Sequence, residues 1–300
     1  MSDWLISIEG TAEGARAALF LALLAAVLHA VFGALQKGRH DPLLARGAID
    51  ASYGLMAAPF ALFIVPWPEP HMWPIFAGVF VIHALYKWAV LASYRRGAFT
   101  VVYPVMRGTG PLFTVIGAWF LFGETFSGIQ WLGVAVLLAG LYGLALYNMA
   151  RITVARETLI PALWFAVLTG LFVALYTTFD AYGIRATADP FTFLAWFFFI
   201  DGLLYPFLAA AFYRRLEDKP TLGPLAFRGI VGGLIAFASF GSIMLATRLD
   251  QVGEAAVLRE TSTVFAALIG WLFLKEQVGP VRAALMGLIA AGAVIVEVGG

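Results

Sequence analysis

Charged and aromatic side chains recur at helical spacing inside long apolar stretches of this sequence. His83 and Lys87 are four residues apart, and Tyr86 follows His83 by three, so all three share one face of a helix. The next apolar stretch carries Tyr103 and Arg107, again four apart. Cations, an imidazole and aromatic rings on neighbouring helices could together bind an anionic group and hold a large apolar or cationic solute.

Two adjacent charges, Arg259 and Glu260, lie in an apolar stretch near the C-terminus. Neighbouring residues on a helix point about 100° apart, so these two cannot pair on a common face. Pairing lowers the cost of burying a charge. We therefore expect Glu260 to approach Arg107 or Lys87 from across the molecule.

These residues suggest one substrate-binding site. An amino acid needs a cation for its carboxylate, an acceptor for its ammonium group and an aromatic slot for a large side chain. Arg107 or Arg259 could bind the carboxylate and Glu260 the ammonium group. Cation–π contacts, worth about 0.5 to 2 kcal/mol, would admit cationic drugs to the same site. The candidate substrate-binding residues are His83, Tyr86, Lys87, Tyr103, Arg107, Trp164, Tyr176, Arg259 and Glu260.

Several ionisable residues also allow a structural interpretation. Arg107 and Arg259 could be helix anchors, and the long stem of Lys87 could carry its ammonium group to a membrane interface. Asp50 and Asp201 lie close to the ends of their predicted helices, where we expect them to be solvated.

The composition is that of a membrane protein. Of the 300 residues, 62% are hydrophobic and 12% are charged, whereas a soluble domain has roughly 25% charged residues. A bilayer core of about 30 Å requires roughly 20 apolar residues per spanning helix. The sequence therefore predicts an all-α polytopic membrane protein with ten transmembrane helices, at 16–35, 48–67, 74–93, 99–122, 128–148, 160–180, 191–212, 227–247, 252–274 and 279–297.

The two halves of the chain, 1–150 and 151–300, are related by a shift of 152 residues. RGTGPLFTVIGAWFLFGE at 107–124 recurs as RETSTVFAALIGWLFLKE at 259–276. Each half holds five predicted helices, and an odd number makes the halves cross the membrane in opposite senses. Such inverted repeats surround a central cavity in many secondary transporters, although a duplicated membrane scaffold is the alternative. The aligned pairs include Arg96/Arg248, Arg107/Arg259, Thr109/Thr261, Trp119/Trp271, Glu124/Glu276 and Gly140/Gly292.

The repeated motif also contains helix-disrupting and helix-ending residues. Pro104 and Pro111 remove backbone donors from the predicted helix 99–122, so we expect this helix to bend where it lines a cavity. Glu124 and Glu276 close the two copies of the motif. We expect them to cap the following helices or to anchor the membrane interface.

A glutamate that closes the helix and a glycine-rich helix after it resemble the drug/metabolite transporter superfamily, in its ten-helix EamA-type branch. The residues concerned are FGETFSGIQWLGVAVLLAG at 122–140 and LKEQVGPVRAALMGLIAAG at 274–292. The resemblance implies an inner-membrane exporter or exchanger of small metabolites, with a cavity lined by helices 1, 3, 4, 6, 8 and 9. Members that export aromatic amino acids are the nearest analogy, and others carry sugars, nucleotide precursors, polyamines or cationic drugs.

The basic residues are distributed unevenly between the connections. The connections after even-numbered predicted helices and before the first helix hold only Arg16, Arg185 and Arg248. The positive-inside rule therefore places the odd connections in the cytoplasm and both termini outside, whereas many members of the resembled family have both termini inside. The odd connections hold Lys37, Arg39, Arg46, Arg95, Arg96, Arg151, Arg156, Arg214, Arg215, Lys219, Arg228, Lys275 and Arg282.

Other classes of protein find less support. The chain has no cysteine, which excludes disulfides and thiolate metal sites. An intramembrane enzyme would need an activated nucleophile, and no such motif accompanies His29 and His83, the two histidines in apolar stretches. We predict no enzyme activity, cofactor, metal or nucleic-acid partner, and either a monomer or a homodimer in the bilayer. Energy coupling stays open: His83 or Glu260 could exchange a proton, or transport could be passive.

The first predicted helix indicates whether a signal peptide is removed and whether this helix could exchange a proton. The acidic N-terminal stretch lacks the basic region of a signal peptide, so we expect this helix to be retained. The helix contains no acidic residue. It therefore lacks the glutamate that the resemblance to small multidrug transporters would require for proton exchange.

Overall fold

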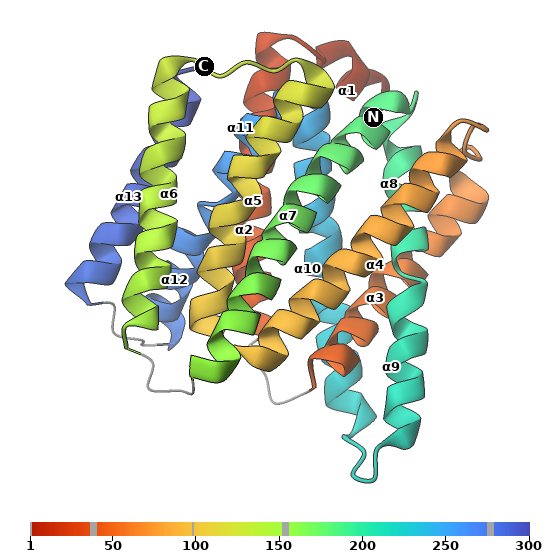
Figure 1. The fold of residues 1–300 in the computed structure, drawn as a ribbon. Helices are drawn as coiled ribbons and strands as arrows, with labels where there is room; N and C mark the ends of the chain where they lie inside the picture. Colours follow the sequence, from red (N-terminus) through yellow and green to blue (C-terminus); the bar gives the residue numbers. More distant parts are fainter. Residues whose placement is uncertain (1, 37–40, 98, 152–155, 275–278) are drawn as a thin grey trace.

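The computed structural model describes residues 2–36, 41–97, 99–151, 156–274 and 279–300, and all regular structure in these ranges is helical (Figure 1). The elements are α1 (Ser2–Ile8), α2 (Ala12–Gln36), α3 (Pro42–Pro59), the π-helix η1 (Phe60–Ile64), α4 (Met72–Arg96), α5 (Phe99–Phe122), α6 (Gly128–Met149), α7 (Arg156–Ala186), α8 (Pro190–Asp201), α9 (Leu204–Arg215), α10 (Leu222–Leu249), α11 (Val252–Arg259), α12 (Ser262–Leu274) and α13 (Pro280–Val298).

Nine stretches of the described residues are long and apolar enough to cross a membrane. They correspond to all but one of the ten predicted helices, and the seventh of them combines α8 and α9 as Pro190–Arg215. The remaining prediction, 252–274, is interrupted between α11 and α12, so neither piece alone has the length of a span. The membrane fold is therefore confirmed, with two of the predicted helices, 191–212 and 252–274, each present as two pieces.

The two repeats run in opposite directions, as predicted. Figure 1 shows α2 descending from the end of the molecule that holds α1, while α7 rises toward that end. Each contact between the halves has an equivalent in which the two repeats change places. α5 packs on α7 just as α11 and α12 pack on α2, and α4 packs on α7 just as α10 packs on α2. α6 packs directly against its own counterpart, α13.

Glycines allow the symmetric helices to approach closely. A Cβ on Gly140 would lie 2.8 Å from the carbonyl oxygen of Leu285, and one on Gly292 would lie 2.6 Å from that of Gly133. The repeat exchanges these two contacts, because the shift of 152 relates Gly133 to Leu285 as it relates Gly140 to Gly292. The α6–α13 interface is thus a close packing of small residues around the pseudo-twofold axis.

The irregular positions differ from those expected from the prolines. α5 is helical throughout Phe99–Phe122 although it contains Pro104 and Pro111. The interruptions lie in the second repeat, between α8 and α9 and between α11 and α12. At the second of these, Glu260 follows the last residue of α11. Backbone groups that a helix break frees inside a membrane protein must find other partners. One of the residues at this break, Glu260, carries a charge.

Two Asp-Pro pairs begin equivalent helices in the two repeats. Asp41 accepts a hydrogen bond from the backbone of Leu43 at the start of α3, and Asp189 accepts one from that of Thr192 at the start of α8. Partial burial raises the pKa of Asp189, but the hydrogen bonds that it accepts from Ser2 and Thr192 outweigh this effect and leave the pKa below its ordinary value. These N-caps fix the start of the helices that carry two of the buried aspartates.

Candidate functional site

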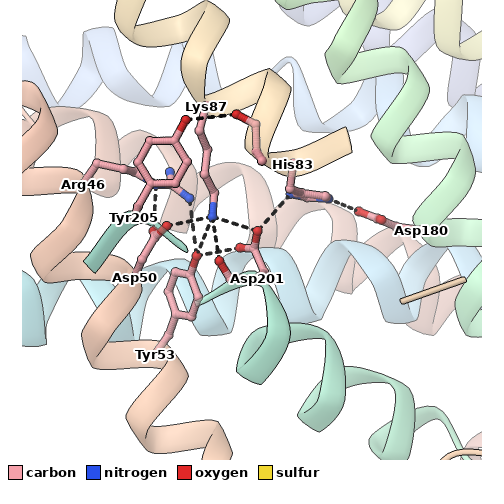
Figure 2. A network of polar contacts seen from close by, with 9 residues as sticks. Arg46, Asp50, Tyr53, His83, Lys87, Asp180, Asp201 and Tyr205 are labelled. Carbon is pink, nitrogen blue, oxygen red and sulfur yellow. Dashed lines mark hydrogen bonds and ion pairs between the residues drawn. The ribbon is translucent and has the colours of Figure 1, made fainter. Parts of the chain in front are cut away.

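Lys87 is buried among oxygen atoms from other helices (Figure 2). Its ammonium group lies 2.7 Å from a carboxylate oxygen of Asp50 and 2.7 Å from one of Asp201, and it donates to the Tyr53 hydroxyl at 3.0 Å. Only 2% of Lys87 is exposed. Its charge is neutralised inside the protein, so the alternative in which it reaches a membrane interface is wrong.

The expectation that Asp50 and Asp201 are solvated is also wrong. Asp50 is fully buried and 7% of Asp201 is exposed. α3 begins at Pro42, well before the predicted start of its helix, and this places Asp50 in the interior of the helix. Asp201 ends α8, but α9 continues the same span, so the end of the helix lies within the molecule.

His83 connects this group to a third carboxylate. Its Nε2 lies 2.9 Å from Asp180 and its Nδ1 lies 3.7 Å from Asp201. Arg46 completes the group through Asp50, at 2.7 Å. We call this group the lysine network, and it consists of Arg46, Asp50, Tyr53, His83, Lys87, Asp180 and Asp201. It holds three carboxylates and two permanent cations, and its geometry gives no metal site among the described residues.

A second charged group forms at the break between α11 and α12. The Arg107 guanidinium lies 2.7 Å from the Glu260 carboxylate and donates to the Ser262 hydroxyl at 2.8 Å and to the Arg259 carbonyl at 3.2 Å. We call these four residues the arginine network. The prediction that Glu260 approaches Arg107 across the molecule is confirmed, while Lys87 has other partners. The carbonyl freed by the helix break is one of the acceptors that stabilise Arg107.

The side chain of Arg259 has a different environment from that of Arg107. It is 3% exposed, and within the described part of the chain its side chain makes one polar contact, a long one of 3.5 Å to the Thr177 hydroxyl. Its Nε has no hydrogen-bond partner among the described residues. Its guanidinium lies 6.0 Å from the centre of the Tyr176 ring. A buried cation without a carboxylate partner is costly unless an anion completes the site.

Arg259 faces a small cavity that is bounded by α7, α10 and α11. Asp180 also lines this cavity, so opposite charges face the same space. The remaining walls are mostly apolar or aromatic, with Phe240 and Tyr176 among them. In this conformation the enclosed space is about that of one water molecule, so a solute can enter only after the surrounding helices move apart.

Tyr176 lies between the two networks. Its ring centre is 4.8 Å from that of His83 and 4.9 Å from that of Tyr86. The ring centre of Tyr103 lies 5.9 Å from the Arg107 guanidinium. The structure therefore brings Tyr86, Tyr103 and Tyr176 next to the buried charges.

One predicted site residue is elsewhere, and five members of the lysine network were not among the predicted site residues. Trp164 is 71% exposed on the outer surface of α7, so the structure does not bring it to the cavity. Asp180 and Asp201 were missed as site residues, and so were Arg46, Asp50 and Tyr53. A signal for the last three was present: Arg46 and Tyr53 lie four and three residues from Asp50, on one helical face.

The sequence model of the EamA-like transporter family matches residues 16–146 and 160–298, one copy in each repeat. The chain belongs to the EamA-like transporter family. No curated protein matches the sequence. A solved crystal structure has a similar fold, with a TM-score of 0.74 and 19% identity over 94% of this chain and 96% of the other. At that identity the similarity supports the fold alone.

Membership in this family makes the chain a multi-pass membrane transporter of small solutes. At the end that holds α1, Arg185 of α7 donates to the carbonyl of Thr247 at 2.8 Å, and Arg248 of α10 donates to that of Ile184 at 2.6 Å. Glu9 pairs with Arg248. These reciprocal contacts hold the ends of α7 and α10 together on one side of the cavity.

In this EamA-like transporter Glu124 also acts at that end, on a helix other than the one expected. It accepts hydrogen bonds from the backbone of Val252 at 2.9 Å and of Gly253 at 3.1 Å, and so caps α11. Ser127 caps the following helix, α6. The expectation that Glu124 caps α6 is wrong, and Glu276 lies outside the described residues. Glu124 thus ties the first repeat to the interrupted helix of the second.

Proposed function

We propose that this EamA-like transporter exports or exchanges amino acids, aromatic ones among them, across the inner membrane by alternating access. The observation that carries the proposal is the Arg259 side chain at the cavity, which has no carboxylate partner among the described residues. Its guanidinium offers paired donors that match the geometry of a carboxylate. A substrate carboxylate would supply the anion that this buried cation lacks.

Asp180 is our candidate for binding the substrate ammonium group. We predicted Glu260 for this role from the sequence, but Glu260 is paired with Arg107. Asp180 lines the cavity opposite Arg259, and its Oδ1 has no hydrogen-bond partner among the described residues. A zwitterion could therefore bridge Asp180 and Arg259 while its side chain contacts the rings of Tyr176 and Phe240.

Alternating access would open the closed end of the cavity. The inverted repeat provides two related packings of the same helices. The contacts of Arg185 and Arg248 with the ends of α7 and α10 would break in one of them. The interruption between α11 and α12 gives the helix that carries Arg259 a place to bend during this change.

Export of organic cations is the second candidate. Asp180 and the Tyr176 ring could together hold a cation without any carboxylate. The two candidates differ in what they require of Arg259. An amino acid needs its positive charge, whereas an organic cation is repelled by it.

A matched ligand series separates these candidates. Thermal shift of the purified protein is measured with L-phenylalanine, phenethylamine, which lacks the carboxylate, and 3-phenylpropionate, which lacks the ammonium group. We expect L-phenylalanine to bind best. We expect Arg259→Gln to weaken its binding about 10- to 100-fold, because a hydrogen bond to a charged group contributes about 1.5 to 3 kcal/mol.

Arg95→Gln is the matched control, because Arg95 is an exposed arginine on α4, outside both networks. We expect this variant to bind L-phenylalanine as the unmodified protein does. Stronger binding of phenethylamine than of L-phenylalanine, increased further by Arg259→Gln, would replace the amino acid proposal with the organic cation one.

The orientation in the membrane is a separate proposal. The basic connections favour both termini outside. Because the chain has no cysteine, single cysteines can report on it. With Ser7→Cys and Asp218→Cys, we expect a membrane-impermeant maleimide added to intact spheroplasts to label the first variant only. Labelling of the second alone would reverse the orientation.

A further inference from the structure

We propose that His83 and Asp180 form a proton-binding site whose proton exchanges with the ammonium group of the substrate. This inference rests on the proposed function, because it names the ion to which transport at that cavity is coupled. It is carried by three independent observations on the lysine network, which are its charge balance, the surroundings of His83 and the free oxygen of Asp180.

The charge balance of the lysine network leaves room for one proton. Asp50, Asp180 and Asp201 contribute three carboxylates, while Arg46 and Lys87 contribute two permanent cations. All of them except Arg46, which is 18% exposed, are buried, and an uncompensated charge there is costly. One proton on His83 makes the network neutral, and its loss leaves one excess negative charge.

The geometry of His83 suits the protonated imidazole. Both ring nitrogens face carboxylates, Nε2 toward Asp180 at 2.9 Å and Nδ1 toward Asp201 at 3.7 Å. A neutral imidazole has one nitrogen lone pair, which would point at a carboxylate oxygen, whereas an imidazolium presents a donor to each. We therefore assign the proposed proton to His83, between Asp180 and Asp201.

Asp180 connects this proton to the cavity. It is 3% exposed, its Oδ2 contacts His83, and its Oδ1 has no partner among the described residues. The same residue lines the cavity opposite Arg259. An ammonium group in the cavity can thus reach the carboxylate that stabilises the imidazolium, and the two cations compete for it.

The groups around His83 on every neighbouring helix are compatible with this competition. α8 contributes Asp201, and α10 presents only Thr247 as a polar cavity residue near Asp180. The nearest cation from α11 is Arg259, which disfavours a second positive charge in the cavity. The other titratable neighbours are Tyr86 and Lys87 of α4, Arg46, Asp50 and Tyr53 of α3, Tyr176 and Asp180 of α7, and Tyr205 of α9.

The exchange conserves charge in the network. When the ammonium group binds Asp180, the N–H bond of the imidazolium breaks, its electron pair stays on the ring nitrogen, and the proton passes to water. The ammonium group replaces the proton as the third cation. When the substrate leaves on the other side, water returns a proton to His83. One substrate thus moves in exchange for one proton.

The proton site can be tested without any substrate. The chain has four histidines, so imidazole NMR of the purified protein follows each one, and His83→Gln assigns the resonance of interest. We expect His83 to titrate as a single proton. In weakly buffered solution below this titration, we expect L-phenylalanine to release about one proton per molecule bound, and Asp180→Asn to abolish the release.

Transport supplies the second test. Proteoliposomes with the membrane potential clamped by potassium and valinomycin are given a gradient of one pH unit. Exchange of one proton per substrate predicts about tenfold accumulation of L-phenylalanine in the more acidic compartment. In His83→Gln and Asp180→Asn, we expect the ratio of accumulation with and without the gradient to fall to one, whatever the absolute rate. His71→Gln, at an exposed histidine, should keep the tenfold ratio.

The outcomes distinguish the two proposals. L-phenylalanine binding without proton release, or with equal accumulation in the presence and absence of the gradient, overturns the proton exchange and leaves the substrate assignment standing. A His83 resonance that does not titrate between pH 5 and 9 overturns it as well. Titration of His83 together with no binding of L-phenylalanine would instead contradict the amino acid proposal.

Discussion

The lysine network and the arginine network lie side by side, but they have different relations to the repeat. Arg107 and Arg259 are equivalent residues of the two halves, at the shift of 152. Lys87 aligns with Ser239 at the same shift, and Asp50 aligns with Phe198 at the shift of 148 that relates the two Asp-Pro pairs. The arginine network is built on a residue that both halves have. In the lysine network, Lys87 and Asp50 have no charged counterpart in the other half.

The repeated arginines themselves have different roles because one position between the halves differs. Glu260 aligns with Gly108, so the second half alone supplies a carboxylate at the axis. That carboxylate neutralises Arg107 and leaves Arg259 facing the cavity. The comparison indicates that duplication supplies the frame and its anchors, while single-copy charges give the site its chemistry.

The largest effect on stability is expected from removing the centre of the single-copy network. Lys87→Met leaves Asp50 and Asp201 without their shared cation. Loss of one partner of a buried ion pair costs about 3 to 5 kcal/mol, and we expect the upper end because two carboxylates are affected. The nine tryptophans allow thermal unfolding in detergent to be followed by intrinsic fluorescence.

The double variant Lys87→Met/Asp201→Asn tests the cause. It removes the charge of Asp201, while Asp50 keeps its ion pair with Arg46, so we expect it to regain part of the lost stability. If the single variant unfolds at the same temperature as the unmodified protein, Lys87 does not hold the network together, and the contrast between the networks fails.

The same contrast explains what could be predicted from the sequence. Apolar length and the repeat predicted the membrane helices and their inverted order, because both signals are spread over many residues. The pairing of Arg107 with Glu260 could be predicted because an isolated buried charge requires a partner. The partners of Lys87 could not, because the start of α3 was placed too late and Asp50 was assigned to solvent. The break in 252–274 could not be predicted, because no proline marks it in the sequence. Contacts with Arg107, which lies far away in the chain, stabilise it instead.

The second largest effect is expected at the arginine network. Glu260→Gln leaves Arg107 without a countercharge, but the Ser262 hydroxyl and the Arg259 carbonyl still accept its hydrogen bonds. We therefore expect a loss near the lower end of the range for broken buried pairs, about 3 kcal/mol. Thermal unfolding measures the effect.

The double variant Arg107→Met/Glu260→Gln completes the cycle for this pair. We expect it to be more stable than Glu260→Gln alone, since it leaves no unpaired Arg107 charge. Additive losses for the two single changes would mean that the residues do not interact, and would remove the explanation for why Arg259 alone faces the cavity.

A smaller effect tests the symmetric frame without any charge. A Cβ on Gly292 would lie 2.5 Å from the backbone nitrogen of Leu137, while one on Gly287 of the same helix meets nothing within 4 Å. Gly292→Ala should therefore cost about 1 to 3 kcal/mol through overpacking. Gly287→Ala should stabilise α13 by about 0.5 to 1 kcal/mol, because alanine has less freedom to lose on folding. Equal unfolding temperatures for the two variants would contradict the close packing of α6 on α13.

The smallest effect is expected from a substitution at Trp164, on the outer face of α7. Comparing it with a substitution at Tyr176 compares the outer face of this helix with its cavity face. Trp164 is 71% exposed, whereas Tyr176 of the same helix is buried beside His83 and Arg259. Trp164→Leu keeps an apolar side chain toward the lipid, so we expect L-phenylalanine flux in proteoliposomes to be unchanged and stability to change by less than about 0.5 kcal/mol. Tyr176→Leu removes a ring from the cavity wall and should reduce the flux. A reduction by Trp164→Leu equal to that by Tyr176→Leu would place substrate contacts on the outer face, where neither network reaches.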